Sequence, residues 1–437
     1  MVDRAALEEM TEDEVLGFAG DCVDTARRAE ADLLRAAFQW AVLHSSDRLD
    51  PAERDLPGRE RSKLLGGPGV PEVTEFAAAE LGARIGRSTF SAAMLIADAQ
   101  DLVHRHPQLW ARVEAGEVKA SYACYVVGKT RELEPDEAAY VDARVAESAD
   151  GRIPWSRFEG LVEGAVAQAA PERAREKEER AQKAVFAKRL RGEAHGMASF
   201  LVRADVATIE AIESGFARQA DALKESRPDD PDLATDDLRR VRAVLLAATG
   251  LDADGDLADV IHVEFVVHTY AGPDAEGVMR LEGHGPVTEE WVRSLLGPRA
   301  RFTIQPVMDL AGQAPVDGYE VPDRHRRAVH LMTPADIFPF ASSTSRSMQV
   351  DHTVPYDEGG VTGIGNYGPM TIPHHRIKTH GGWQVQQPFP GIYVWRDPHG
   401  AFYVVDHTGT RRVPSAPARR APMVELWRAP FPIEYAA

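Results

Sequence analysis

Cysteine is almost absent from this chain of 437 residues, since only Cys22 and Cys124 occur. Two such distant residues cannot supply a disulfide framework or a cysteine-based zinc motif, and their scarcity suits a reducing compartment. A membrane-spanning helix requires a run of about eighteen apolar residues, and every apolar run in this chain is much shorter. The acidic N-terminus also has no apolar segment of the kind found in export signals. These absences predict a cytoplasmic protein that does not enter the membrane.

Basic residues are too few to balance the acidic ones, and the formal net charge is -18. Phosphate binding draws its free energy from Lys and Arg side chains that displace counterions. The whole surface therefore cannot be a platform for nucleic acid. Any contact with DNA must be local, and it must be helped by a divalent ion or by clusters of basic residues.

Apolar residues make up 44% of the chain, which is enough for two or three domains with cores. The stretch from Thr11 to Glu14 has the pattern of a capping box and begins a long amphipathic helix that reaches Ser45. The two helices around Gly86 have the spacing of a helix-turn-helix, but with few basic residues a plain helical hairpin is favoured. Helical spacing and cap residues predict helices at 73–85, 88–104, 107–116, 118–132, 135–148, 154–169, 205–225 and 235–249.

Charges alternate in sign along residues 172–193, and most basic residues there have an acid four positions away. This pattern predicts a solvated helix. The end of the segment, from Lys188 to Arg191, is less balanced. A cationic last turn satisfies the helix dipole without a ligand, so contact with phosphate is the less favoured alternative.

Strand character appears after residue 260. Residues 260–269 and 301–308 read as strands, and a short capped helix is expected to begin after Thr288. Residues 391–397 and 401–406 are apolar and aromatic and are separated by Pro-His-Gly, which predicts a β-hairpin. The tail beyond it is rich in proline and is expected to be extended.

Eight of the fifteen histidines follow Glu320. The segment from Met348 to Trp383 contains an Asp-His pair, one Asn in a Gly-rich loop and a His-His pair. Asp351 and a later histidine can share one divalent ion and leave His352 free to activate water. The segment therefore predicts a metal-assisted phosphodiesterase.

A literal G-x-G-x-x-G pattern runs from Gly363 to Gly368. No strand rich in Val and Ile precedes it, and no long helix begins at its last glycine. A dinucleotide-binding site is therefore rejected, and the glycines are interpreted as shaping a hairpin loop.

The order of Asp351-His352, then Asn366 fourteen residues after the histidine, then His375 nine residues later resembles the HNH endonucleases. That resemblance implies a ββα-metal unit with His352 as the general base, Asp351 and His375 as metal ligands, and Asn366 holding the loop and His352 in place. It also implies one divalent ion (Mg, Mn, Ni or Zn) and hydrolysis of DNA that leaves 5′-phosphate and 3′-hydroxyl ends. His374 projects about 100° away from His375 on a helix, so only one of the two faces the metal.

Three further residues near His375 are candidates for binding roles. His380 is either a third metal ligand or a cation that caps the helix, and the capping role is slightly favoured. Lys378 lies three residues after His375 on the same helix face. Lys378 and Arg376 are thus candidates for contact with nucleic-acid phosphates, although a solvated lysine is the ordinary alternative.

Residues 75–127 are similar to the helical domain of the actinobacterial thirteen-E-twelve repeat family, whose members pair that domain with a C-terminal HNH unit. The likeness continues in MASFLVRADVATIE, GHGPVTEEWVRSLL and PVMDLAGQAP. Members often carry cysteine pairs around the ββα unit, but the matching places here hold Asp336, Ala341 and Thr371. No structural zinc is therefore expected. Packing is expected from Phe338, Phe340, Ile372 and Trp383.

The sequence as a whole predicts an α+β fold. Its expected parts are a large, mostly α-helical domain at 1–225, a mixed α/β connector at 226–330, an HNH ββα-metal unit at 331–385 and a β-hairpin with a Pro-rich tail at 386–437. The expected function is that of a divalent-metal-dependent DNA endonuclease with a histidine base. Two alternatives stay open: a catalytically inactive HNH-fold protein that binds nucleic acid or a partner, and a helical oligomer with a vestigial C-terminal unit. The oligomeric state is not predicted.

Overall fold

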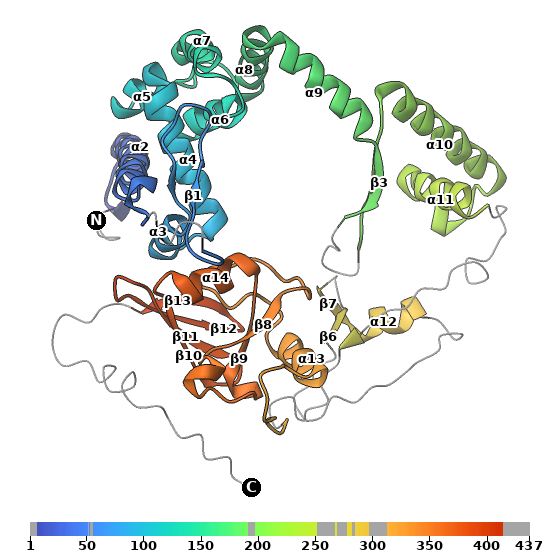
Figure 1. The fold of residues 1–437 in the computed structure, drawn as a ribbon. Coiled ribbons are helices and arrows are strands. Elements are labelled where there is room, and N and C mark those ends of the chain that lie inside the picture. Colours follow the sequence, from blue (N-terminus) through green and yellow to red (C-terminus); the bar gives the residue numbers. More distant parts are fainter. Residues whose placement is uncertain are drawn as a thin grey trace. The chain divides into compact units, whose positions relative to one another are not determined.

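The computed structural model is a mixed α+β structure with a large helical N-terminal region and a β-sheet near the C-terminus (Figure 1). Two compact units are present. The first combines Met1–Pro171 with Pro306–Ala437, and the second is Glu172–Gln305. The residues that the structure describes are 7–50, 52, 56–190, 197–250, 267–268, 278–281, 285–296 and 313–413.

The helices of the first unit begin and end at cap residues that the sequence displays. The capping box of Thr11 and Glu14 forms at the start of α2, which runs over Glu12–Leu43. Ser88 caps α4, and Gly86 separates α3 from α4 with a left-handed φ of 73°. The remaining bounds are α3 Ala77–Ile85, α4 Thr89–Arg105, α5 Pro107–Glu114, α6 Ala120–Thr130, α7 Pro135–Val145 and α8 Trp155–Ala169.

The helix predicted to begin at Val73 begins later in the structure. Val73–Thr74 is not helical but forms strand β2, which pairs antiparallel with β1, Ser62–Lys63. Two β-branched residues in a row favour an extended backbone, and a partner strand eleven residues earlier supplies the hydrogen bonds. The helix therefore begins at Ala77.

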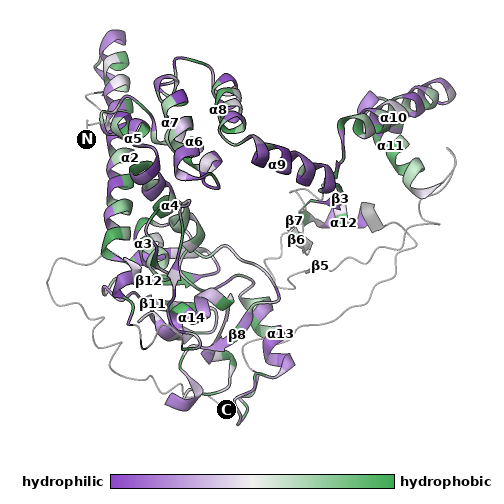
Figure 2. Cartoon of the chain, turned by 45° about the horizontal axis from the view of Figure 1, so that its top comes forward, coloured by the Kyte–Doolittle hydropathy of each residue, from purple (hydrophilic) through white to green (hydrophobic). Residues whose placement is uncertain are grey.

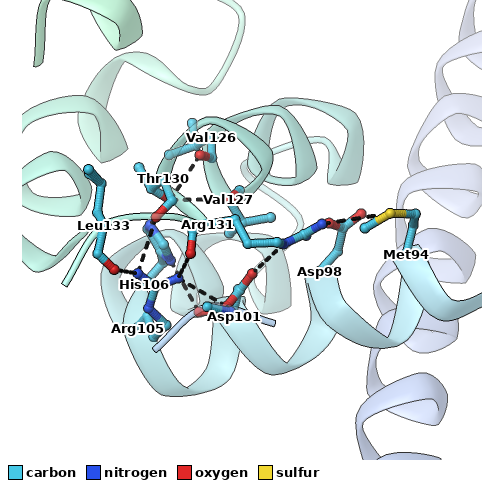
Figure 3. A network of polar contacts seen from close by, with 11 residues as sticks. Met94, Asp98, Asp101, Arg105, His106, Val126, Val127, Thr130, Arg131 and Leu133 are labelled. Carbon is cyan, nitrogen blue, oxygen red and sulfur yellow. Dashed lines mark hydrogen bonds and ion pairs between the residues drawn. The ribbon is translucent and has the colours of Figure 1, made fainter. Parts of the chain in front are cut away.

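A closed network of charged side chains is buried inside the helical region (Figure 3). The Asp101 carboxylate is fully buried and accepts hydrogen bonds from the Gly67 N–H at 2.7 Å, from Arg105 at 3.1 Å and from Arg131 at 2.9 Å. Arg105 also donates to backbone carbonyls, including that of Thr130 at 3.1 Å. A buried charge is tolerated where it is paired, and both oxygens of this carboxylate have donors.

His106 belongs to the same network and fits it as a neutral ring. Its Nδ1 lies 3.1 Å from the Asp101 carbonyl oxygen, and its Nε2 lies 2.8 Å from the Thr130 hydroxyl. Nδ1–H therefore donates to the carbonyl, and in the neutral ring Nε2 accepts from the Thr130 hydroxyl, which also lies 3.0 Å from the Val126 carbonyl oxygen. Burial lowers the pKa of His106 to about 4, because the charged ring would lose its solvation.

The C-terminal part of the first unit contains a four-stranded antiparallel sheet in the order β10-β11-β12-β13. The predicted hairpin is confirmed as β11, Ile392–Arg396, and β12, Phe402–Asp406, with Gly400 at a φ of +83° in the turn. Two outer strands complete the sheet, β10 at Gln384–Phe389 and β13 at Gly409–Val413.

A hydrophobic core joins this sheet to helix α3. It combines Phe76 and Ala79 with Ile377, Trp383 and Trp395, all of which are buried. The expected packing of Phe338 and Trp383 is confirmed, and Phe340 packs against the same core. Ile372 does not, because it begins helix α14 with 61% of its surface exposed, and Ile377 faces the core instead.

Ion pairs and hydrogen bonds reinforce the contact between the helical region and the C-terminal part. Arg376 forms a two-pronged pair with Glu75 at 2.8 and 2.9 Å. The Arg84 side chain lies 3.0 Å from the Asp397 carboxylate, and His399 lies 2.7 Å from Glu80. These contacts are more than 300 residues apart in sequence.

The second unit begins with the charged helix α9, Pro171–Lys183, which is hydrophilic along its length (Figure 2). The helix ends ten residues earlier than expected. Lys188 and Arg189 lie in strand β3, Phe186–Arg189, which pairs with β4, Phe200–Arg203. The helical interpretation was thus wrong for Lys188 and Arg189, because the Phe-Leu-Val run that pairs with this strand is not adjacent in sequence. Arg191 lies outside the described residues.

The other elements of the second unit follow the predicted caps. Asp205 caps α10 and Thr235 caps α11, while Thr288 accepts a hydrogen bond from the N–H of Trp291 in α12. The strand expected at 260–269 is described only at β5; the one at 301–308 and the Pro-rich tail lie outside the described residues. Bounds are α10 Val206–Ser226, α11 Asp236–Thr249, β5 Val267–His268, β6 Val278–Leu281, β7 Gly285–Thr288 and α12 Glu289–Leu296.

Among the described residues, no helix combines the length and apolar character needed to cross a bilayer.

Candidate active site

The segment that contains the Asp-His pair folds as two antiparallel strands followed by a helix. Strand β8, Gln349–His352, pairs with β9, Tyr367–Met370, and helix α14 covers Ile372–His380. Pro373 lies in the first turn of the helix, where its missing N–H costs nothing, and Gly381 follows the last turn. The strand therefore ends at the Asp-His pair, and the helix carries both adjacent histidines.

Asn366 ties together the loop between the two strands. Its Oδ1 accepts hydrogen bonds from the Thr353 hydroxyl and, at 2.8 Å, from the Val354 N–H. Its Nδ2 donates to the carbonyl oxygens of Val354 at 2.9 Å and Val361 at 3.0 Å. Four bonds from one buried amide fix the loop that follows His352.

Asp351 and His375 converge. The Nε2 atom of His375 lies 3.3 Å from Oδ2 of Asp351, and the two side chains are 35% and 15% exposed. Lys378, one turn further along α14, places its ammonium group 2.7 Å from the same carboxylate oxygen and also donates to the backbone carbonyl of His352. The carboxylate thus faces one imidazole and one cation at a surface that water can reach.

Gln349 decides which nitrogen of His375 faces Asp351. Its Oε1 lies 2.8 Å from Nδ1 of His375, so Nδ1 must donate its hydrogen there. In the neutral ring Nε2 then carries a lone pair directed at a carboxylate oxygen. Two acceptors that face each other at this distance repel, unless the ring is protonated or a cation lies between them.

The two side chains fit the first coordination shell of one divalent ion. Two ligands at metal distances of about 2.0–2.2 Å in tetrahedral geometry lie roughly 3.3–3.6 Å apart, which matches the separation of Asp351 and His375. A ligating histidine almost always donates its other ring N–H to an acceptor, as His375 does to Gln349. Within the described part of the chain, no three His, Cys, Asp or Glu side chains group together as a metal site.

His352 has a partner that leaves one ring nitrogen basic. Its Nε2 lies 3.0 Å from the Thr362 hydroxyl, which itself donates to the carbonyl oxygen of Gly318. Because the hydroxyl hydrogen is already used, Nε2–H must donate to Thr362, and Nδ1 carries the lone pair. Burial lowers the pKa of His352, which keeps the ring neutral at pH 7.

A polar cluster occupies the place where the resemblance implies cysteines. Asp336 accepts hydrogen bonds from the N–H of Thr371 at 2.9 Å, from its hydroxyl at 2.8 Å and from Nδ1 of His374 at 2.7 Å. The His374 ring also stacks on Phe338, at a centroid distance of 4.5 Å. Adjacent histidines therefore face different neighbours, and this cluster fixes the start of α14 without cysteine.

The remaining expected site residues lie nearby in other contacts. Arg376 is held by Glu75 and donates to the carbonyl oxygen of Arg59 at 2.9 Å. His380 ends α14 with its ring against Gly58, and burial lowers the pKa of that ring. The structure thus brings Asp351, His375 and Lys378 together but directs His380 and Arg376 toward the loop that precedes β1.

Sequence reasoning missed Gln349 and Thr362. Gln349 precedes Asp351 by two residues in a strand, so strand alternation places both on one face. That signal was available in the sequence. Thr362 has no such signal, because its contact with His352 depends on how the loop folds.

Comparison with known families matches residues 52–331 to the model of a domain of unknown function, DUF222. The chain belongs to this family. The DUF222 match covers most of the helical region and ends before β8, so the candidate site lies C-terminal to the matched residues. No curated protein and no solved structure matches the chain.

Proposed function

We propose that this DUF222 protein is a divalent-metal-dependent endonuclease of the HNH type, which hydrolyses DNA phosphodiester bonds with His352 as the general base. The observation that supports this proposal most strongly is the hydrogen bond from His375 to Gln349. It directs the His375 lone pair at the Asp351 carboxylate, an arrangement that a bound cation stabilises.

Each side chain has a distinct role in the proposed reaction. Asp351 and His375 would hold the metal ion, which would supply positive charge to the scissile phosphate and the leaving oxygen. His352 would take a proton from the attacking water at Nδ1, because Thr362 occupies Nε2. Asn366 would keep the loop after His352 in position. Lys378 would orient the Asp351 carboxylate through its ion pair.

The distribution of charge favours a local contact with nucleic acid. Residues 1–171 hold 31 acidic and 19 basic residues, whereas residues 306–437 hold 12 of each. The acidity of the chain therefore lies mainly outside the part that carries the candidate site. Helix α13, Asp323–Met332, exposes Arg324 and Arg326 and packs through Val329 against the core formed by Val350 and Tyr367. These arginines are suited to phosphate contacts beside the site.

Plasmid nicking tests the proposal directly. The wild-type chain should convert supercoiled plasmid to open circles with Mg²⁺, Mn²⁺, Ni²⁺ or Zn²⁺ and not with EDTA. His352→Ala should lower the rate by about 10²–10⁴-fold, the range for a general base. His407→Ala is the matched control, because His407 is exposed in the turn between β12 and β13. Equal cleavage by wild type and by His352→Ala would contradict the assignment.

One observation favours a second candidate function. The Lys378 ammonium already neutralises Asp351, so the carboxylate has a cationic partner without a metal ion. A catalytically inactive protein that binds nucleic acid through the same fold would need no more than this. DNA binding unaffected by EDTA, with no cleavage under any of the four ions, would establish that alternative.

A further inference from the structure

Two tyrosine rings with exposed surfaces flank the candidate general base. Tyr319 is 69% exposed, yet its ring is nearly parallel to the His352 ring, with centroids 5.8 Å apart and an angle of 19° between the planes. Tyr356 is 37% exposed and lies edge-on to Tyr319 at 6.1 Å. Two exposed aromatic rings in contact with each other offer faces on which a planar group can stack.

A pocket of about 530 Å³ opens beside Tyr356, whose ring forms part of its wall and contacts the Tyr319 ring. Its size falls within the range of small-molecule sites. Gly360 forms part of its wall, where an added Cβ would lie 1.9 Å from the Val354 carbonyl oxygen, so no side chain can fill this part of the loop. The pocket is lined by Pro315, Val316, Asp317, Tyr356, Gly359, Gly360, Val361 and Thr362.

The charges around the pocket decide what kind of group it suits. The described residues that line it include Asp317 and no Lys or Arg, and Asp357 and Glu358 are exposed on the adjoining turn. These carboxylates repel a phosphate. A neutral, planar group with N–H donors suits the tyrosine faces and the Asp317 carboxylate. The amino-bearing nucleobases have these properties.

The pocket is also connected to the proposed reaction centre. Thr362 forms part of its wall and accepts the hydrogen bond from His352. A base held in the pocket would therefore keep the phosphate of the same strand near His352. A base inside an intact duplex is stacked and paired and cannot present its face to a tyrosine.

We propose that the pocket beside Tyr319 and Tyr356 binds one unpaired nucleobase of the substrate strand, so that the preferred substrate is single-stranded or contains an extruded base. This inference rests on the proposed function, because it takes nucleic acid as the substrate. The pocket would make the protein distinguish unpaired from paired bases, while Arg324 and Arg326 on α13 would contact the phosphates.

Equilibrium binding of the full chain, measured by fluorescence anisotropy in EDTA, tests this site without cleavage. The probes are a labelled single strand of about twelve nucleotides and the same sequence as a duplex. Wild type should bind the single strand more tightly. Tyr319→Ala and Tyr356→Ala should each weaken that binding by about 5- to 150-fold, the range for loss of one stacked base. Tyr319→Phe should retain it, because the ring face is preserved.

Two controls separate a binding role from a structural one. Tyr140→Ala removes a tyrosine that is 47% exposed on α7, and it should leave the affinity unchanged. Oligonucleotides with one abasic position, moved along the strand, should reveal a position where the missing base weakens wild-type binding. The same abasic strand should bind Tyr319→Ala no more weakly than the intact strand does, because the two losses remove one interaction.

The outcomes distinguish this inference from the proposed function. Metal-dependent cleavage that proceeds equally on duplex and single strand, with no effect of Tyr319→Ala, would overturn the nucleobase site and leave the nuclease intact. Tyrosine-dependent binding of single strands without cleavage under any ion would support the site and contradict the nuclease. Equal affinity of wild type for both probes in EDTA would also overturn the site.

Discussion

Two groups of carboxylate, imidazole and cationic side chains occur in this molecule, and their surroundings are opposite. In the helical region Asp101 and Arg105 are almost completely buried, and every oxygen of the carboxylate has a donor. In the ββα segment Asp351 and His375 are partly exposed, and Lys378 shares one carboxylate oxygen with the imidazole. The residue types are alike, but access to solvent differs.

This difference indicates how a structural network can be told from a reactive one. The network around Asp101 is closed, since its donors come from three separate segments and leave no position for a ligand (Figure 3). Such a group stabilises one packing arrangement of the helices. The group around Asp351 includes an imidazole lone pair that faces a carboxylate at the surface. An exogenous cation can satisfy that arrangement.

Arg105→Met should have the largest effect on stability, because it removes one partner from the buried network around Asp101. It leaves the Asp101 carboxylate buried without its partner on the same helix, and the free energy of unfolding should fall by about 3–5 kcal/mol. Arg35→Met is the matched control: Arg35 pairs with Asp32 and Glu114 at a surface where all three side chains are exposed, so its loss should lower the free energy of unfolding far less. Urea denaturation measures both. A loss below 1 kcal/mol for Arg105→Met would show that the buried network is not structural.

His106 gives the closed network a pH dependence. Its pKa is about 4 in the folded chain and about 6.5 in the unfolded chain. Between these values the unfolded state binds more protons, so stability is lost as the pH falls from about 7 to about 4, by up to about 3 kcal/mol. Denaturation of wild type and of His106→Gln across this range should show the larger loss in wild type. The same pH dependence in both would contradict the neutral, buried ring.

Gln349→Leu tests the open group. Without an acceptor for Nδ1–H, the His375 ring is no longer held with its lone pair toward Asp351, and Mn²⁺ affinity should weaken by about 10–100-fold. Gln349→Glu is the matched control, because a carboxylate can accept the same hydrogen bond. Isothermal titration calorimetry measures both affinities. Unchanged affinity in Gln349→Leu would show that this glutamine does not orient a metal ligand.

The helices of the fold were predictable from local signals, and the strands less so. Four helix starts are marked by a cap residue whose side chain accepts a hydrogen bond from the backbone N–H three residues later. These caps are Thr11, Ser88, Asp205 and Thr235. Strand β3 was missed because half of its residues are charged and the apolar strand that pairs with it, β4, is not adjacent to it in sequence. The outer strands β10 and β13 were also missed, although Pro390-Gly391 and Gly409 mark the turns that join them to the central hairpin.

Some residues of the candidate site could likewise be predicted from local sequence signals, and others could not. Asp351, His352, Asn366 and His375 could be selected because their order and spacing are local. The cluster of Asp336 with Thr371 and His374, and the pairing of Arg376 with Glu75, could not. These contacts join segments 35 to 301 residues apart, and no periodicity in the sequence reports such distances.

Pulsed electron paramagnetic resonance of the Mn²⁺-loaded chain tests the central claim most directly. We expect one bound Mn²⁺ whose spectrum contains the coupling of a histidine nitrogen. That coupling should disappear in His375→Asn and remain in His374→Asn, although the two residues are adjacent. A nitrogen coupling that persists in His375→Asn, or no bound Mn²⁺ in wild type, would contradict a metal site built from Asp351 and His375.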